Sequence, residues 1–276
     1  MPTVCAAIVL CTLAGARASQ AATCDGHDTT VLVENTTLVE GHTLLEGGDP
    51  RNPTVVLFHE LPGLTHHDQV VGARLVCEGF HVYMPLLFGA RGDDNQTAGR
   101  HVSCDEDRGP LFWCTQGGRE HPIITAWVRD AVKKIGAGAR PIAVIGMCLT
   151  GTFALSLAQD ANVAVAVMAQ PTLSFWFWNA SSLDLPDATL RGALAALAQR
   201  QAGVFLVRAR FDFISAPEKI DRLTLEIGRT RPTLNDVYVR QVFTAKHSVL
   251  TMAAPDPDSS VMRDLLLMLR QHLTTP

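Results

Sequence analysis

Apolar runs of strand length alternate with helical patterns along most of this chain, and this alternation limits the fold more than any other feature. The run Thr54–Phe58 is apolar almost throughout, as expected of a strand covered on both faces. Strands separated by helices form a mostly parallel sheet with helices on both faces, so the sequence predicts the α/β class. We expect strands at Thr29–Val33, Thr43–Leu45, Thr54–Phe58, Phe80–Met84, Pro141–Ile145, Val163–Met168, Gly203–Val207 and Val237–Phe243. We expect helices at residues 69–77, 124–135, 149–159, 190–201, 217–227 and 261–273.

The part of the chain that follows the first 21 residues is expected to form a single domain. Of its 276 residues, 47% are hydrophobic and 18% are charged, which suits one globular domain with a filled core. No Pro/Ser-rich linker, internal repeat or shift in composition divides it, so we expect one domain at residues 22–276. In parallel sheets ligands bind beyond the carboxyl ends of the strands. The loops at those ends are therefore where chemistry is expected.

The first residues of the chain have the features of a targeting segment. Val4–Ala14 is an apolar run that is too short to span a bilayer but suits the core of a signal peptide. The segments 16–18 and 19–21 are both possible cleavage sites, although the first three residues lack a lysine or arginine. We expect residues 1–21 to be a signal peptide or a disordered leader. Export to the periplasm or medium is the first interpretation, and a cytoplasmic protein is the alternative.

Charge and motifs argue against several partners. The net charge of −4, with both signs mixed, gives no basic face for nucleic acid. There is no dinucleotide-binding G-x-G-x-x-G motif after the first strand and no phosphate-binding G-x-x-x-x-G-K-[ST] motif. His66, His67 and Asp68 stand side by side at a helix start and do not point to one metal centre. We expect no cofactor, no metal, no nucleic acid and no membrane span, in a monomer or weak oligomer.

Seven cysteines without a C-x-x-C pair do not make a disulfide scaffold. In an oxidising compartment Cys104 and Cys114 could bridge within their loop, and two free thiols are the alternative. Cys77 lies in an apolar helical pattern and is most simply a core residue.

The loop after Pro141–Ile145 carries the candidate nucleophile. Gly146-Met147-Cys148-Leu149-Thr150-Gly151 runs from a buried strand directly into a helix, as in the nucleophile elbow of hydrolases. Such a sharp turn needs small neighbours, and the helix start favours the Cys148 thiolate. Thr150 stands where glycine is usual, so its side chain must find room beside the next strand. A buried, inert cysteine is the alternative.

An acid and a base follow the cysteine in the order that this arrangement requires. Asp212 comes after the strand Gly203–Val207, and His247 comes after Val237–Phe243. Each alone could be an ordinary capping or surface residue. Together they predict that Asp212 orients His247 and that His247 takes the proton of Cys148.

A third loop, His59-Glu60-Leu61-Pro62-Gly63, directly follows Thr54–Phe58. The backbone N–H groups of Leu61 and Leu149 are expected to form the oxyanion hole. A carboxylate at the end of a buried strand is unfavourable unless it is paired, so we expect Glu60 to face the active site.

At these positions the chain resembles a known family. The matching motifs are Phe58-His59-Glu60-Leu61-Pro62-Gly63-Leu64, Glu78-Gly79-Phe80-His81-Val82, Pro85, Gly146-Met147-Cys148-Leu149, Asp212 with Pro217, and His247-Ser248. They resemble the dienelactone hydrolase family of the α/β-hydrolase fold, in order and spacing, from Thr54 to the C-terminus. The resemblance implies hydrolysis of a lactone or activated ester through a Cys–His–Asp triad. It also implies that Glu60 contacts the resting thiol and swings away when substrate binds, which would protect the thiol from oxidation.

One feature departs from the family. Dienelactone hydrolases hold a substrate carboxylate with two arginines, one after the third main strand and one shortly after the catalytic histidine. Arg91 matches the first, but residues 247–251 contain no arginine to match the second. Arg208 or Arg210 could compensate, or could pair with Asp212 instead.

Two segments are candidate lids. The stretch from Gly89 to Arg119 is long and polar, and Ser174–Trp178 is strongly aromatic. A patch buried under the next helix is the alternative for the aromatic segment.

The sequence thus predicts a cofactor-free hydrolase that cleaves a small lactone or carboxylic ester through a thioester acyl-enzyme. A non-catalytic binding protein on the same fold is one alternative, and acyl transfer to an acceptor other than water is another.

Overall fold

The structure is a computed structural model, and the residues that it describes form several separate ranges of the chain. The described residues are 24, 28–87, 89–92, 113–114, 119–120, 122–137, 140–159, 162–172, 180–183, 185–231, 233, 235–244, 246–253 and 260–274, with the backbone alone at 113–114, 119–120, 122–126 and 252–253. The leader 1–21, Cys104, the side chain of Cys114, most of the stretch from Gly89 to Arg119, and Ser174–Trp178 lie outside them. The predictions for these segments stay predictions.

An eight-stranded sheet runs through the molecule, in the order β1-β2-β4-β3-β7-β8-β9-β10. The strands β4, β3, β7, β8, β9 and β10 are parallel, whereas β1 and β2 add an antiparallel edge. Their bounds are β1 Val33–Asn35, β2 Leu44–Gly47, β3 Thr54–Leu57, β4 His81–Pro85, β7 Ile142–Met147, β8 Val163–Ala169, β9 Gly203–Ala209 and β10 Val237–Val242. A separate pair, β5 (Trp113–Cys114) and β6 (Arg119–Glu120), is antiparallel. This is the mostly parallel sheet that the alternating pattern predicts.

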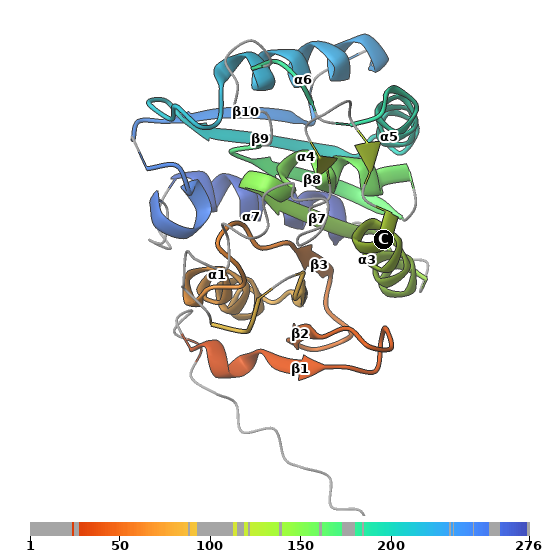
Figure 1. The fold of residues 1–276 in the computed structure, drawn as a ribbon, viewed down its shortest axis with the longest axis vertical. Coiled ribbons are helices and arrows are strands. Elements are labelled where there is room, and N and C mark those ends of the chain that lie inside the picture. Colours follow the sequence, from red (N-terminus) through yellow and green to blue (C-terminus); the bar gives the residue numbers. More distant parts are fainter. Residues whose placement is uncertain are drawn as a thin grey trace, which may run out of the picture.

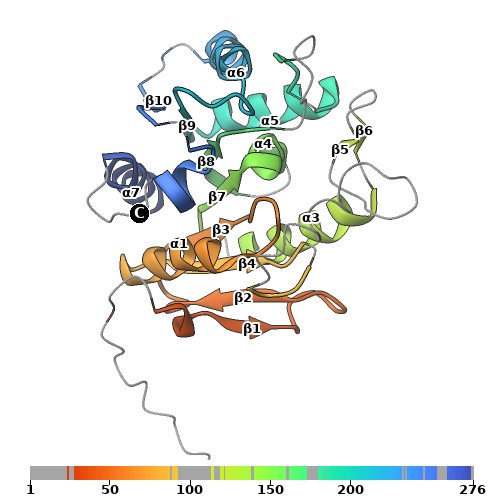
Figure 2. The same cartoon turned by 60° about the vertical axis from the view of Figure 1, so that its left-hand side comes forward.

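Helices cover both faces of the sheet (Figures 1 and 2). One core lies under α1 and α7, and the other lies under α3, α4, α5 and α6. The helices are α1 His66–Cys77, α3 Pro122–Gly136, α4 Gly151–Ser156, α5 Asp187–Gln199, α6 Pro217–Thr230 and α7 Ser260–Leu273. The central strands β7 and β9 are buried at every position, which explains why their sequences do not alternate. Among the described residues, no helix combines the length and the hydrophobicity needed to cross a bilayer.

The predicted elements are found, with shifts of one to three residues at most ends. The largest difference is at the start, where the predicted strand Thr29–Val33 is divided. A 3-10 turn occupies Thr29–Val31, and β1 begins only at Val33. The reason is local: the Asp28 carboxylate accepts a hydrogen bond from the Thr30 N–H at 3.0 Å and caps the turn. The helix predicted at 149–159 is also interrupted, since α4 lies between two 3-10 turns.

Cys77 is bonded to Cys24, so the prediction that it is a plain core residue is wrong. It ends α1, and the disulfide joins it to a residue 53 positions earlier. The thiol that the apolar pattern assigned to the core therefore ties the N-terminal segment to α1. Cys148 is the one free cysteine among the residues whose side chains the structure describes.

Removing this disulfide is expected to destabilise the protein. A cross-link that closes a loop of this length stabilises a fold by about 2–4 kcal/mol, chiefly by restricting the unfolded chain. We expect the double variant Cys24→Ser/Cys77→Ser to lose about that much free energy of unfolding in urea titrations without reductant. An unchanged midpoint would show that the bond does not form in the folded protein.

Candidate active site

Cys148 occupies a strained turn at the carboxyl end of the central strand β7. Its backbone has a φ of +50°, in the left-handed region that residues other than glycine rarely adopt. A 3-10 turn, Cys148–Thr150, leads from the strand into α4. Strain of this kind is found mostly at functional sites, where the surrounding structure holds it in place. The predicted nucleophile elbow is therefore present in its geometry.

Two glycines allow this turn. A Cβ atom at Gly146 would overlap the carbonyl oxygen of Thr150, and one at Gly151 would lie 2.7 Å from Cα of Pro171. Thr150 fits because its hydroxyl group forms hydrogen bonds with backbone groups of the turn itself. The Thr150 Oγ1 accepts from the Met147 N–H at 2.9 Å and lies 2.9 Å from the Met147 carbonyl oxygen. The requirement for a small residue thus falls on Gly151, one position after the usual site.

Asp212 and His247 meet next to the cysteine. Asp212 follows β9 and His247 follows β10, and 2.7 Å separates the Asp212 Oδ2 from the His247 Nδ1. The other carboxylate oxygen of Asp212 accepts from the N–H groups of Ile214 and Ser215, at 2.8 and 3.1 Å. Asp212 is therefore fixed from both sides. The second ring nitrogen of His247, Nε2, is left for other partners and lies 3.4 Å from the Thr172 hydroxyl.

The electrostatics favour a charged imidazole in this position. Burial alone would lower the pKa of His247, but its hydrogen bonds to Asp212 and Cys148, together with their charges, raise this pKa to about 10. Burial also opposes ionisation of Asp212, but the His247 hydrogen bond and charge lower its pKa below the usual value. Asp212 and His247 are therefore held as an ion pair of carboxylate and imidazolium.

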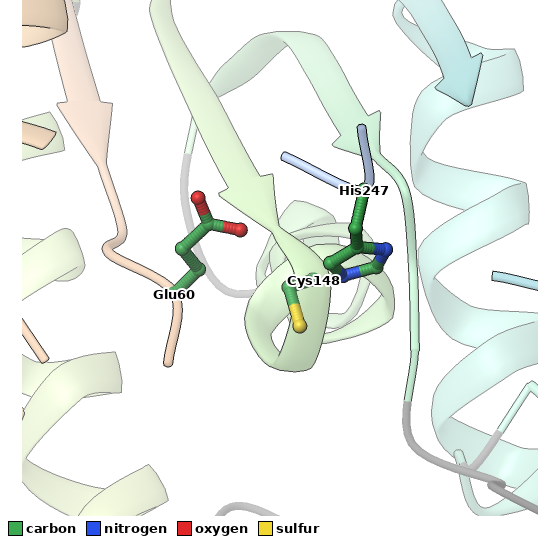
Figure 3. A group of neighbouring side chains, drawn as sticks. All are labelled: Glu60, Cys148 and His247. Carbon is green, nitrogen blue, oxygen red and sulfur yellow. The ribbon is translucent and has the colours of Figure 1, made fainter. Parts of the chain in front are cut away.

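Glu60 lies on the other side of the sulfur from His247, as Figure 3 shows. A carboxylate oxygen of Glu60, the sulfur of Cys148 and a ring nitrogen of His247 all lie within 4.8 Å of one another. The Glu60 side chain is buried, as expected from its position after β3. Residues far apart in the sequence are therefore brought together as predicted.

Two neutral side chains hold the Glu60 carboxylate, and the sequence analysis named neither. The Thr251 hydroxyl donates to Oε1 at 2.6 Å, and the Gln170 amide donates to Oε2 at 3.2 Å. Gln170 directly follows β8 and has a φ of +36°, so a second strained residue stands at the carboxyl end of a central strand. Its place directly after a buried strand is the signal that could have identified it. Thr251 carries no such signal.

His59 supports the loop that carries Glu60 and Leu61. Its Nε2 accepts from the Leu87 N–H at 3.0 Å, so Nδ1 carries the hydrogen and donates to the Glu60 carbonyl oxygen at 3.0 Å. Full burial lowers the pKa of His59 to about 4, so the ring is neutral at physiological pH. Both ring nitrogens of His59 are therefore engaged in holding the backbone of this loop.

Arg91, which is predicted to bind a substrate carboxylate, makes other hydrogen bonds in the structure. Its guanidinium donates to Oε1 of Gln69 at 2.9 Å and to the carbonyl oxygens of Thr29 and Leu32. These three acceptors attach Arg91 to the N-terminal segment and to α1. That Arg91 binds a substrate carboxylate stays a prediction.

The other two arginines named as possible substitutes, Arg208 and Arg210, also have partners within the protein. The buried Arg208 guanidinium donates to the carbonyl oxygens of Ser215 and Asp212, at 3.0 and 2.9 Å. Arg210 lies near the exposed rings of Phe211 and Phe243. Arg208 thus braces the loop of the acid, in contacts with backbone oxygens and not through the carboxylate of Asp212.

Asp68 is a second buried carboxyl group behind Glu60. Its Oδ1 lies 3.4 Å from the Glu60 N–H, and its Oδ2 accepts from the Thr65 N–H and hydroxyl at the start of α1. Burial first, and the charge of Glu60 second, raise the pKa of Asp68 to about 7. In the unfolded chain the pKa is the ordinary value near 3.8. Asp68 therefore keeps its proton in the folded protein over a range in which the unfolded chain has lost it.

This difference predicts a pH dependence of stability. Between about pH 4 and pH 7 the folded state binds one more proton than the unfolded state, so stability falls as the pH rises through this window. In Asp68→Asn the group cannot titrate, so we expect this fall to be absent and the two proteins to differ most above pH 7. Urea midpoints of both proteins at pH 5 and pH 8 measure it. Equal changes in the two midpoints would contradict the assignment.

Comparison with known proteins agrees with this geometry. The model of the dienelactone hydrolase family matches residues 42–249. No protein in a curated set matches the chain significantly. Among solved structures, a putative dienelactone hydrolase from Klebsiella pneumoniae is similar at 15% identity and a TM-score of 0.60, covering 87% of this chain and 98% of that one.

Two other structures have the same fold. An esterase from Pyrococcus furiosus is similar at 17% identity and a TM-score of 0.54, with 89% of this chain and 93% of that one covered. A thioesterase domain from the curacin biosynthetic pathway is similar at 14% identity and a TM-score of 0.51, with 86% and 99% covered. The fold is the α/β-hydrolase fold. Because the family model matches well over half of its length, the chain belongs to the dienelactone hydrolase family.

Proposed function

We propose that this protein hydrolyses a small lactone or carboxylic ester, with Cys148 as the nucleophile, His247 as the base and Asp212 as the residue that orients the base. The observation that carries the proposal is the combination of the strained Cys148 backbone with the 2.7 Å contact between His247 and Asp212. Membership of a family of hydrolases supports it.

The geometry allows a reaction in two steps, in which Cys148 is first acylated and the thioester is then hydrolysed. His247 Nε2 first takes the thiol proton of Cys148, and the resulting thiolate then attacks the carbonyl carbon. The backbone N–H groups of Leu61 and Leu149 are proposed to stabilise the negative oxygen that forms. The C–O bond then breaks, and His247 returns the proton to the leaving alkoxide. Water, deprotonated by His247, cleaves the thioester and frees the acid and the thiol.

The proposed acyl group carries no negative charge. The carboxylate of Glu60 stands within 4.8 Å of the sulfur, and its described partners, Thr251 and Gln170, are neutral. Arg91 is engaged at the N-terminal segment. A substrate carboxylate placed here would be desolvated next to another carboxylate, and the cationic group described beside the sulfur, the imidazole of His247, is already paired with Asp212. Dienelactones carry such a carboxylate, so a neutral ester or lactone fits this site better.

A matched pair of esters tests the substrate class. We expect kcat/KM for p-nitrophenyl butyrate to exceed that for the mono-p-nitrophenyl ester of succinate by at least about tenfold, since tenfold corresponds to only about 1.4 kcal/mol. Arg91→Ala should leave this ratio unchanged. A preference for the charged ester, lost in Arg91→Ala, would restore Arg91 to the substrate site.

Trapping the acyl-enzyme tests the reaction itself. Rapid acid quenching during turnover should give a mass increase equal to the acyl group on the peptide that contains Cys148. Turnover without this adduct would contradict covalent catalysis, and no turnover of any ester or lactone would favour a binding protein. Products formed faster with an added alcohol or amine acceptor would indicate acyl transfer.

Export is the proposed location. The disulfide between Cys24 and Cys77 supports it, since disulfides form and persist chiefly in oxidising compartments. Fractionation of the cells that make the protein would test it, and a reduced protein found only in the cytoplasm would contradict it.

A further inference from the structure

We propose that Glu60, Cys148 and His247 also form a binding site for Zn²⁺, and that zinc bound there reversibly blocks the nucleophile. Each residue offers one ligand atom, and the three atoms lie within 4.8 Å of one another. They come from the ends of three different strands, so the fold itself brings them together (Figure 3).

The donor set suits zinc in particular. Thiolate sulfur, imidazole nitrogen and carboxylate oxygen are the ligands that Zn²⁺ takes in proteins, at about 2.3, 2.0–2.1 and 2.0–2.2 Å. Ligand atoms around a tetrahedral ion lie roughly 3.3–3.7 Å apart when these lengths apply. The present separations need to shrink by no more than about 1.5 Å, which side-chain rotation can supply. Magnesium and calcium prefer oxygen ligands only and fit poorly.

The groups behind the ligands are those of a built zinc site. Ligating histidines donate their second ring N–H to a carboxylate, and His247 does this through Nδ1 to Asp212 at 2.7 Å. The Glu60 carboxylate is likewise oriented by Thr251 at 2.6 Å and by Gln170 at 3.2 Å. Two of the three ligands, His247 and Glu60, are thus oriented by hydrogen bonds to neighbouring side chains before any metal binds. Three protein ligands leave a fourth position for water.

Charge and access favour the ion as well. Thiolate and carboxylate together balance the two positive charges of zinc, and binding displaces the proton that Cys148 and His247 hold between them. The Cys148 and Glu60 side chains are buried, but the His247 side chain is 19% exposed, so the site can be reached past the imidazole. The bound ion would occupy the lone pairs of both the nucleophile and the base. Esterase activity is therefore expected to stop, and a chelator should restore it.

Direct binding measurements keep this proposal separate from the proposed hydrolysis. Isothermal titration of the full-length chain with zinc chloride should show one site that Cys148→Ser abolishes. Glu60→Gln and Thr251→Val should each weaken binding by at least about tenfold, as loss of a ligand or of its supporting hydrogen bond does. Thr251→Ser, which keeps the hydroxyl, should bind like the wild type. Co²⁺ in place of zinc should give a thiolate-to-metal absorption band that is lost in Cys148→Ser.

A matched control comes from a second His–Glu pair. His81 Nε2 and Glu46 Oε1 lie 2.8 Å apart, without a cysteine. Glu46→Gln should leave zinc affinity unchanged. Zinc bound equally by Cys148→Ser would overturn the proposal. So would unchanged affinity in Glu60→Gln when Cys148→Ser loses it, since that pattern describes a metal held by the thiol and imidazole alone. Inactivity of the protein on all esters would leave the binding result standing.

Discussion

Replacing Cys148 with alanine is expected to lower kcat/KM for a neutral aryl ester by about 10⁴-fold or more, without unfolding the protein. Loss of a nucleophile that acts with its base removes most of the rate enhancement, and only the contribution of binding and of the oxyanion hole remains. The alanine methyl is smaller than the thiol and fits the same turn, whose left-handed backbone is imposed by its surroundings.

Measured kcat/KM and the thermal unfolding midpoint, taken together, check this expectation. Cys148→Ser is the control for shape, because it keeps a side chain of similar size while replacing the thiol with a far less acidic hydroxyl. We expect it to fold like the wild type and to be much slower. An alanine variant that hydrolyses the ester at the wild-type rate would remove Cys148 from the reaction and, with it, the proposed mechanism.

Replacing Asp212 with asparagine is expected to lower kcat by about 10³- to 10⁴-fold. The amide can keep the contact with His247 Nδ1 but cannot stabilise the positive imidazolium, and it favours the wrong tautomer of the ring. The wild-type carboxylate contributes to raising the pKa of His247 to about 10. In the variant the pKa of His247 should fall, so the chemical shift of its ring protons should titrate at a lower pH than in the wild type.

A second Asp–His pair provides the matched control. The carboxylate of Asp236 lies 3.6 Å from Nε2 of His272. Asp236 directly precedes the parallel strand β10, whereas Cys148 directly follows β7, so the two lie at opposite ends of their strands. Asp236→Asn removes the same charge from a similar pair and should leave kcat within about twofold of the wild type. Equal losses in the two variants would indicate that Asp212 acts only through stability or overall charge.

The order of elements and the main site residues could be predicted because the sequence marks them locally. A buried strand such as β7 has no polar positions, and the chemistry-bearing residues follow their strands directly. Parallel strands place these ends at one edge of the sheet. The meeting of Cys148, His247 and Glu60 therefore follows from topology, without knowledge of any side-chain contact.

What could not be predicted depends on contacts between distant segments. The partners of the Glu60 carboxylate, Thr251 and Gln170, lie 191 and 110 positions away from it. An arginine has many acceptors within reach of its long side chain, and for Arg91 the fold supplies carbonyl oxygens of the N-terminal segment. Cys77 resembles any small apolar residue in its helix, since bridging depends on where Cys24 comes to lie. In these cases the sequence gives the residue types, but it does not indicate which residues lie next to them in the folded protein.

The bond between Cys24 and Cys77 has a practical consequence for handling the protein. One molecule must hold two of its sulfurs oxidised while a third, that of the proposed nucleophile Cys148, stays reduced. Dithiothreitol, added by habit to preserve a thiol enzyme, would also sever the tether of the N-terminal segment. Cys148 is only 6% exposed, so we expect its sulfur to oxidise more slowly than an exposed thiol. Purification in air with a chelator, and without reductant, should therefore yield the more active preparation.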